Sequence, residues 1–272
     1  MLNVKPAPWK VIITYWVLST CLTAFINLVL FPSPFFDPIT KGTRGLVDAT
    51  LQANLLNILL FGILVFGWGK LRPMDVGLDW SKLKQGISLT VLLWILAQAI
   101  VLLINWINGD IHLNPLWSKF GVTTVLGALI AQLAGNAFFE EMEYRGFYLS
   151  QFYIRIKDPI ERWKLGWALF FMACLFVLSH IPNRIFFGYA LADIPADFAM
   201  LFMWGLFFAA IYLISGNLFF AVGVHALMNQ PTMITEATFP VGLLISLLAL
   251  IMIIYLGIRK RKTAPVRMAE NQ

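Results

Sequence analysis

The sequence predicts an all-α integral membrane protein in which eight transmembrane helices form a single bundle, with both termini cytoplasmic. Of its 272 residues, 60% are hydrophobic and 12% are charged, whereas about 25% of the residues of a soluble domain are charged. Apolar runs of roughly the 20 residues that cross a bilayer also recur along the chain. The net charge of +6 is spread over the segments between these runs. It therefore indicates membrane topology and no nucleic-acid partner.

Eight apolar runs account for the expected membrane helices. The first is too long for the core of a signal peptide, and no small-residue cleavage site follows it, so it is expected to remain as a span. Pro182 is expected to end the fifth helix, and a Ser-Gly-Asn turn at 215–217 separates the sixth from a short seventh. The expected spans are 11–30, 51–68, 87–106, a long helix from about 122, then 165–181, 197–215, 218–229 and 241–258.

The basic residues between these spans predict the orientation. An even number of spans places both termini on one side, and the segments on that side carry most of the Lys and Arg residues. Because cytoplasmic loops are enriched in these residues, we expect cytoplasmic termini and a multi-pass protein of the cell membrane. Residues 1–119 would hold three scaffold helices and 120–232 a catalytic core of helices four to seven. Residues 233–272 would hold the eighth helix and a basic cytoplasmic tail.

The fourth helix carries an unusual cluster of charge, at Glu140, Glu141, Glu143 and Arg145. Each such residue costs about 2.5–3.5 kcal/mol at the centre of a bilayer, so the group must pair or line a wet cavity. Glu141 and Arg145 are four residues apart with the acid first, which favours an ion pair on a helix. This pairing leaves Glu140 and Glu143 without a charged partner in the same helix.

The same helix is predicted to have two different faces. Gly127, Ala131 and Gly135 recur every four residues, a pattern that lets another helix approach closely. At about 100° per residue, Glu140 lies on the side opposite this stripe. The polar face comprises Gln132, Asn136, Glu140, Glu143 and Tyr144.

Helix lengths place two histidines near the depth of Glu140. The basic cluster after the fourth helix lies roughly 22 Å beyond Glu140, and His180 lies roughly 24 Å back from that cluster. His225 and Asn229 share a helix face roughly 12–18 Å from the same surface. The third histidine of the chain lies in a polar turn and is expected at the surface.

One carboxylate, two imidazoles and one amide around a single cavity would suit hydrolysis. A carboxylate and an imidazole can hold and deprotonate a water molecule, and an imidazole and an amide can donate to a developing oxyanion. Glu140, His180 and His225 could equally be three zinc ligands with an open fourth position. The residues therefore leave two alternatives for the cofactor, none or one zinc ion.

Three motifs together resemble the CPBP intramembrane proteases, which comprise CAAX-processing endopeptidases and bacteriocin-processing or bacteriocin-immunity proteins. The motifs are Glu140-Glu141-x-x-x-Arg145, Phe176-x-x-x-His180 and His225-x-x-x-Asn229. The resemblance covers roughly residues 120–232. For Glu141 and Arg145 it implies a supporting, structural role behind the site.

The resemblance also implies catalytic roles and a substrate. Glu140 would be the general base that activates water, and His180 would help to hold that water. His225 and Asn229 would stabilise the oxyanion. The substrate would be a membrane-associated peptide or protein tail, prenylated or not, and the enzyme a glutamate-type or metal-dependent peptidase.

Two other classes of function compete with hydrolysis. Intramembrane Glu and His residues also build the proton relays of transporters, although the chain shows no second half that mirrors the fourth helix, as many transporters do. A catalytically silent scaffold or immunity protein is the other alternative. The sequence gives no indication of oligomeric state.

Overall fold

The computed structural model describes residues 4–157 and 160–263, and this part of the chain contains helices and no strand longer than an isolated bridge. Seven of its helical stretches are long and apolar enough to cross a membrane. They are Trp9–Leu30, Ala49–Trp68, Trp80–Asn108, Val122–Arg155, Arg162–Phe186, Ile194–Ser215 and Val241–Arg259. The predicted all-helical, multi-pass class is confirmed. The predicted count of eight is not, because the expected seventh span forms a helix of only 12 residues.

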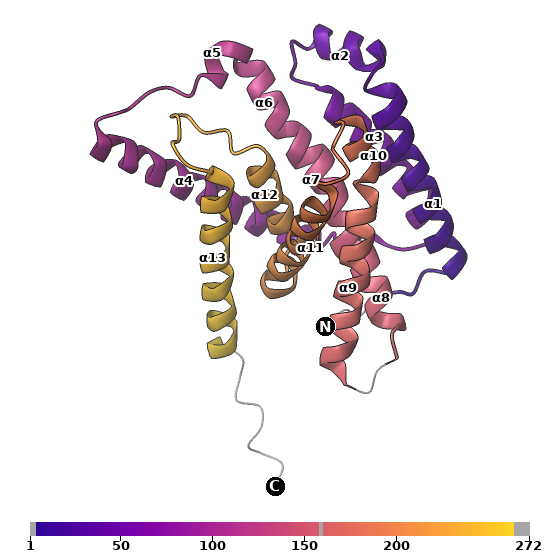
Figure 1. Ribbon diagram of the computed structural model, residues 1–272. Helices are drawn as coiled ribbons and strands as arrows, with labels where there is room; N and C mark the ends of the chain where they lie inside the picture. The colour runs from indigo at the N-terminus through magenta and orange to yellow at the C-terminus, as the bar shows by residue number, and fades with distance from the viewer. Residues whose placement is uncertain (1–3, 158–159, 264–272) are drawn as a thin grey trace.

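Most of these stretches are built from one or two helices (Figure 1). The principal elements are α1 (Trp9–Phe25) with η1 (Ile26–Leu30), α3 (Ala49–Phe61) with η3 (Gly62–Trp68), α4 (Leu83–Asn108), α6 (Val122–Ala131), α8 (Leu149–Arg155), α9 (Glu161–Ser179), α11 (Ile194–Ser215), α12 (Leu218–Asn229) and α13 (Val241–Thr263). Short helices occupy the connections, namely η2 (Pro34–Phe36), α2 (Asp37–Gly42), η4 (Pro73–Val76) and α5 (Leu116–Phe120), or one end of a long stretch, namely η5 (Trp80–Lys82) and α10 (Ile181–Phe186). The tail expected after the last span lies, from residue 264 onward, outside the described residues.

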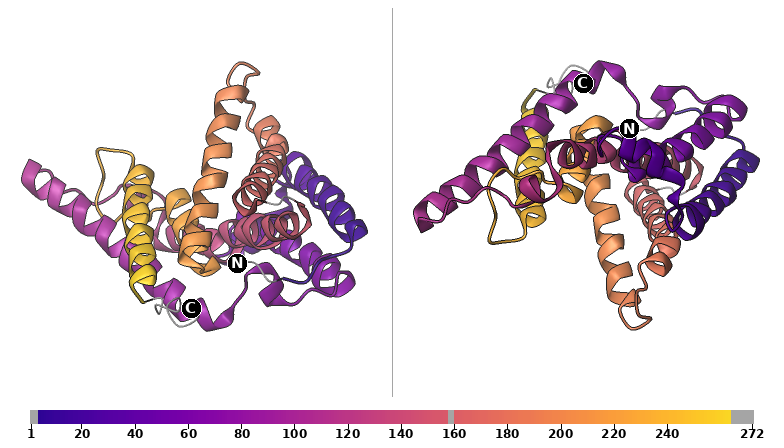
Figure 2. Two further views of the ribbon diagram at one scale, coloured as in Figure 1. Left: turned by 90° about the horizontal axis from the view of Figure 1, so that it is seen from below. Right: turned by 90° about the horizontal axis from the view of Figure 1, so that it is seen from above.

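The short helix α12 lies at the centre of the bundle. It contacts α4, α11 and α13 as well as the long stretch that begins with α6, and every residue from Leu218 to Leu227 is buried. A helix that is apolar on all sides is stable only when it is enclosed in this way. In Figure 2, α1 and α3 lie on one side of the molecule and α4 and α13 on the other.

Glycine sets the closest approach between α12 and α4. A Cβ atom on Gly223 would lie 1.8 Å from the Thr90 hydroxyl oxygen, so only glycine allows the two helices to approach so closely. Before α12, Gly216 adopts φ +68° and ends α11, and the Asn217 side chain accepts a hydrogen bond from the N–H of Phe220 at 3.2 Å. The predicted tight turn is present, and its asparagine caps the helix.

The expected regular fourth helix is interrupted by two π-helical segments, η6 (Gln132–Asn136) and η7 (Glu141–Tyr148), on either side of α7 (Ala137–Glu140). A π-helical turn holds more residues than an α-helical turn and is often found at functional sites. The assumed uniform rotation of about 100° per residue was therefore wrong from residue 132 onward. The small-residue stripe does pack closely: a Cβ on Gly127 would lie 2.0 Å from the Gly45 carbonyl oxygen, and Gly135 lies against Leu51 of α3.

The chain around Pro182 also differs from the prediction. The helix α9 already ends at Ser179, and His180 forms the link to α10, which has Pro182 in its first turn. Proline is tolerated at this position because the first N–H groups of a helix have no partner within it. Pro182 thus helps to begin a second helix, and His180 lies at the junction.

Candidate active site

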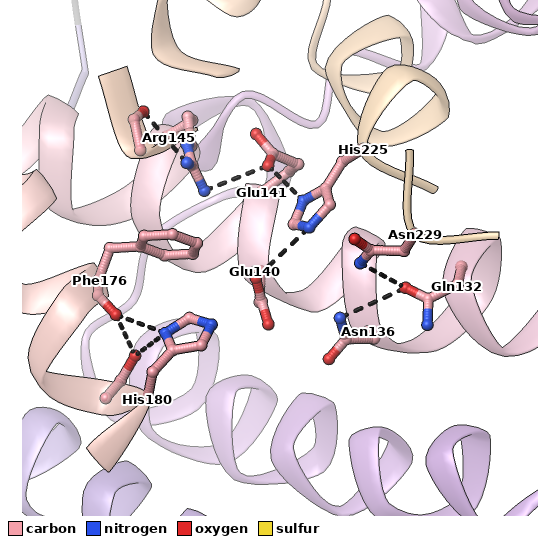
Figure 3. Close-up of polar contacts among 11 residues, drawn as sticks. Gln132, Asn136, Glu140, Glu141, Arg145, Phe176, His180, His225 and Asn229 are labelled. Atoms are coloured by element: carbon pink, nitrogen blue, oxygen red, sulfur yellow. Dashed lines mark hydrogen bonds and ion pairs between the residues drawn. The ribbon is translucent and has the colours of Figure 1, made fainter. Parts of the chain in front are cut away.

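A cavity of about 820 Å³ lies between the long stretch 122–155 and the helices around it. This volume lies within the usual range for binding pockets, about 300–1,000 Å³. The cavity is lined by all four residues expected to act in hydrolysis, namely Glu140, His180, His225 and Asn229. In Figure 3 the Glu140 carboxylate is seen between the two imidazole rings.

Glu140 is the last residue of α7, at the junction with the π-helical segment η7. Its side chain is 15% exposed, and its Oε2 atom lies 3.7 Å from Nε2 of His225. This separation exceeds a hydrogen bond, so both atoms remain able to bind another group. Glu140 therefore has the partial exposure to the cavity that a general base needs.

Glu141 turns away from the cavity and is completely buried. Its Oε1 atom lies 2.8 Å from Nδ1 of His225 and 3.1 Å from Nη1 of Arg145. The ion pair expected from the spacing of Glu141 and Arg145 is therefore present. Because an ionised carboxylate can only accept, His225 donates through Nδ1–H, and its Nε2 atom is directed to the Glu140 side.

Aromatic rings and a backbone carbonyl hold the other members of this group. The His225 ring stacks on Phe208, with ring centroids 4.2 Å apart and an interplanar angle of 15°. The Arg145 guanidinium lies 4.6 Å from the centroid of the Phe176 ring and donates to the Gly205 carbonyl at 3.1 Å. These contacts compensate the buried charge of Arg145 and restrict the orientation of His225.

His180 is oriented by its own helix end. Its Nδ1 atom lies 2.7 Å from the Phe176 carbonyl oxygen, which can only accept, so Nδ1 carries the proton. In the neutral ring the Nε2 atom is then an acceptor. Ser179 shares the same carbonyl, at 2.8 Å. The Phe-x-x-x-His motif thus supplies the carbonyl that sets the tautomer of the histidine.

A small group of amides adjoins Glu140. Asn229 donates from Nδ2 to Gln132 Oε1 at 3.0 Å, and Asn136 donates to the same oxygen at 3.4 Å. Figure 3 shows these three side chains beside Glu140. An amide nitrogen carries two hydrogens, so Asn229 keeps one for another acceptor.

Glu143 has a partner on a distant helix. Its Oε1 atom accepts a hydrogen bond from the Tyr15 hydroxyl of α1 at 2.8 Å, and both residues are buried. The carboxyl nevertheless lines the cavity that contains Glu140. The sequence indicated that Glu143 needed a partner, but nothing in the pattern of α1 distinguished Tyr15.

The arrangement of possible metal ligands bears on the zinc alternative. No group of three or more His, Cys, Asp or Glu side chains in the described part of the chain is placed to hold a metal ion. Nδ1 of His180 and Nδ1 of His225 are both engaged by oxygen atoms, which leaves Nε2 of each ring as the nitrogen that could bind a metal. His112, expected at the surface, is exposed and lies 2.6 Å from Asp110.

The sequence analysis missed several cavity residues on the N-terminal helices. Asn27 of η1 and Asn54 and Asn57 of α3 line the cavity. Polar residues in an otherwise apolar span are a recognised signal of function or pairing. The positions of the two α3 asparagines, three residues apart, could have drawn attention to this face.

Residues 122–230 match a family model described as Type II CAAX prenyl endopeptidase Rce1-like. The chain matches no curated protein and no solved structure. The matched segment contains Glu140, His180, His225 and Asn229, four of the residues that line the cavity. The chain therefore carries an Rce1-like domain, consistent with the CPBP family of intramembrane proteases. The resemblance inferred from the three motifs is confirmed.

Proposed function

We propose that the chain is an intramembrane endopeptidase that cleaves a membrane-associated peptide or protein tail, prenylated or not, with water activated by Glu140. One observation carries this proposal. Glu140 lines a large cavity, its Oε2 atom lies 3.7 Å from a histidine held in place by Glu141, and all three residues belong to the Rce1-like segment.

Each proposed step uses a group whose orientation is supported by a contact. Glu140 takes a proton from water while Nε2 of His180 accepts a hydrogen bond from the same water. The resulting hydroxide attacks the scissile carbonyl. Nδ2–H of Asn229 donates to the oxyanion, and His225 donates through Nε2 when both of its ring nitrogens carry a proton. Glu140 then delivers its proton to the leaving amine as the carbon–nitrogen bond breaks.

The orientation in the membrane is part of the proposal. In Figure 1, α1 begins and α13 ends in the lower half of the molecule. The central α12 continues the alternation of direction between α11 and α13, although it is too short to span a bilayer by itself. We therefore propose eight traverses with both termini on one side, and the Lys and Arg residues of the segments on that side favour the cytoplasmic side of the cell membrane.

The test uses the purified full-length chain with two kinds of substrate, a prenylated CAAX peptide and a panel of transmembrane-segment peptides. Cleavage by the wild type that is lost in Glu140→Gln, and unaffected by a chelator, is the expected result. Chelator-sensitive cleavage with one zinc ion per chain would instead make Glu140 and the histidines metal partners. Substrate-dependent flux without cleavage would favour a transporter, and a phenotype that survives Glu140→Gln would favour a scaffold.

A further inference from the structure

The cavity has a second wall that lies outside the Rce1-like segment. The helix α3 contacts η6 and α7 (Figure 1), and its Asn54 and Asn57 line the same cavity as Glu140. The two asparagines are three residues apart, so they share a helix face. They are only 8% and 6% exposed, respectively.

The amide of Asn57 has an unmet hydrogen-bonding requirement. Its Oδ1 atom is buried and has no hydrogen-bond partner among the described residues. Asn54, by contrast, donates from Nδ2 to the Thr50 carbonyl at 2.9 Å. Native proteins leave few buried polar atoms unpaired because such atoms lose the hydrogen bonds they had in water. An unpaired acceptor on a side chain that lines a cavity therefore indicates a ligand with an N–H or O–H donor.

The charge of the lining selects the kind of ligand. The cavity already contains the carboxyl groups of Glu140 and Glu143. Its arginine, Arg184, is held by both oxygens of Asp197 at 2.7 and 2.9 Å. An anionic ligand such as a lipid phosphate is therefore disfavoured. A carboxamide has one acceptor and a donor group, the same pair that a peptide unit presents.

We propose that Asn57, assisted by Asn54, binds the backbone of the substrate peptide in the cavity that contains Glu140. This inference rests on the proposed function and extends it to α3. On binding, the Asn57 amide turns toward the cavity, so that its Oδ1 atom, which is shielded in the free chain, accepts from one backbone N–H of the peptide. The two asparagines lie about 4.5 Å apart along the helix axis, which spans between one and two residues of an extended chain at about 3.3 Å per residue. In a membrane interior these contacts replace the hydrogen bonds of water.

Binding is measured in the full-length Glu140→Gln variant, which retains the cavity but lacks the base. The probes are the prenylated CAAX peptide and the transmembrane-segment peptides. Adding Asn57→Leu is expected to raise Kd by roughly two- to tenfold, the effect of one ordinary hydrogen bond. In chains that retain Glu140, the same substitution is expected to raise KM by a similar factor and to leave kcat nearly unchanged.

Backbone N-methylation of the peptide separates a direct contact from a structural effect. Each backbone N–H around the cleaved bond is methylated in turn. In the chain that retains Asn57, one methylated peptide is expected to bind more weakly than the unmethylated peptide. In the Asn57→Leu variant, the same two peptides are expected to bind with equal affinity. If the losses of binding free energy from methylation and from Asn57→Leu simply add for every peptide, the proposal is overturned, because two groups that do not contact each other show no coupling.

The matched control is Asn105→Leu on α4. Asn105 is buried, with 3% exposure, and donates to the Glu236 carbonyl at 2.7 Å away from the cavity lining. Asn105→Leu should lower the unfolding temperature and leave Kd unchanged. Asn57→Leu should preserve the unfolding temperature, since it removes an unpaired polar atom. Asn57→Ala provides a second variant in case leucine fills the cavity.

The outcomes separate this proposal from the proposed function. Cleavage by the wild type together with an unchanged Kd in Asn57→Leu would overturn the role of Asn57 alone. Peptide binding that depends on Asn57, without cleavage by the wild type, would overturn the protease activity alone. Failure of every peptide in the panel to bind would overturn both.

Discussion

Nδ1 of His225 lies 2.8 Å from Oε1 of Glu141, two buried residues that are 84 positions apart in the chain. The contact joins α12 to the π-helical segment η7 and sets the direction of the other ring nitrogen, which is directed to Glu140. The second acidic residue of the Glu-Glu pair thus orients the histidine, while the first faces the cavity.

Glu141→Gln is therefore expected to reduce both activity and stability. The loss of the oriented imidazole should lower kcat by about 10²-fold, the low end for the removal of one oxyanion donor. The free energy of unfolding should fall by about 3–5 kcal/mol, because Arg145 is left as an uncompensated buried charge. Cleavage kinetics and unfolding in detergent measure the two effects.

The double variant Glu141→Gln with Arg145→Met separates the effect on activity from the effect on stability. Replacing both members of a buried ion pair is often neutral for stability, so the free energy of unfolding should largely return while kcat stays low. Recovery of both quantities together would show that Glu141 supports activity only through folding.

Tyr15→Phe should destabilise the protein by about 1–3 kcal/mol, because Oε1 of the buried Glu143 loses the donor that now lies at 2.8 Å. Tyr255→Phe is the control, since Tyr255 on α13 is 62% exposed, and such substitutions usually change stability by less than about 0.5 kcal/mol. Equal unfolding temperatures for the two variants would count against a stabilising role for the Tyr15 contact.

Gly146→Ala is expected to lower stability by about 1–3 kcal/mol through overpacking. A Cβ at Gly146 would lie 2.1 Å from the Val76 carbonyl oxygen, a backbone atom that cannot rotate away. Gly166→Ala on α9 provides the matched comparison because nothing lies within 4 Å of its added Cβ. The control should raise the unfolding temperature slightly, as alanine favours a helix over glycine. A similar rise in Gly146→Ala would show that η7 and η4 are not tightly packed.

The connection between the second and third spans should make stability depend on pH. Burial raises the pKa of Asp75, but hydrogen bonds from the Arg72 side chain and from the N–H groups of Arg72 and Lys5 outweigh it, and the pKa lies below its ordinary value. The ionised Asp75 carboxylate therefore stabilises the fold at pH values above its ordinary pKa of about 4. This stabilisation is lost as the pH falls through the lower pKa that Asp75 has in the folded chain.

Unfolding temperatures of wild type and Asp75→Asn between about pH 7 and pH 3 test this dependence. The wild type should be more stable at neutral pH, and its advantage should shrink below about pH 4. Because Arg72 is largely exposed, its charge contributes little, and added salt should have a small effect. An advantage that does not change with pH would contradict this account.

The sequence was sufficient to predict the long spans, because a run of apolar residues is a property of the chain itself. It also located the polar stripe from Gln132 to Tyr144, whose members line the cavity. The π-helical segments could not be foreseen, since an extra residue in a turn changes no apolar pattern. The assumed regular rotation failed for this reason.

The contacts of the cavity were harder to predict than its members. The spacing of Glu141 and Arg145 was enough to predict their ion pair. The contact between Glu141 and His225 could not be predicted in this way, because it depends on how α12 packs against η7. Asn57 was overlooked because an isolated amide in an apolar span has many possible partners. Only the three-dimensional structure shows that its side chain lines the cavity, and that its buried Oδ1 atom has no hydrogen-bond partner among the described residues.

Cleavage of the peptide panel by wild type, Glu140→Gln and Glu143→Gln, measured side by side, tests the central claim most directly. Both glutamates lie on the same helical stretch and line the same cavity, but only Glu140 is proposed to activate water. Glu140→Gln should lose cleavage by at least about 10²-fold, whereas Glu143→Gln should keep most of it, because glutamine can still accept from Tyr15. Cleavage that persists in Glu140→Gln would contradict the assignment of Glu140 as the base.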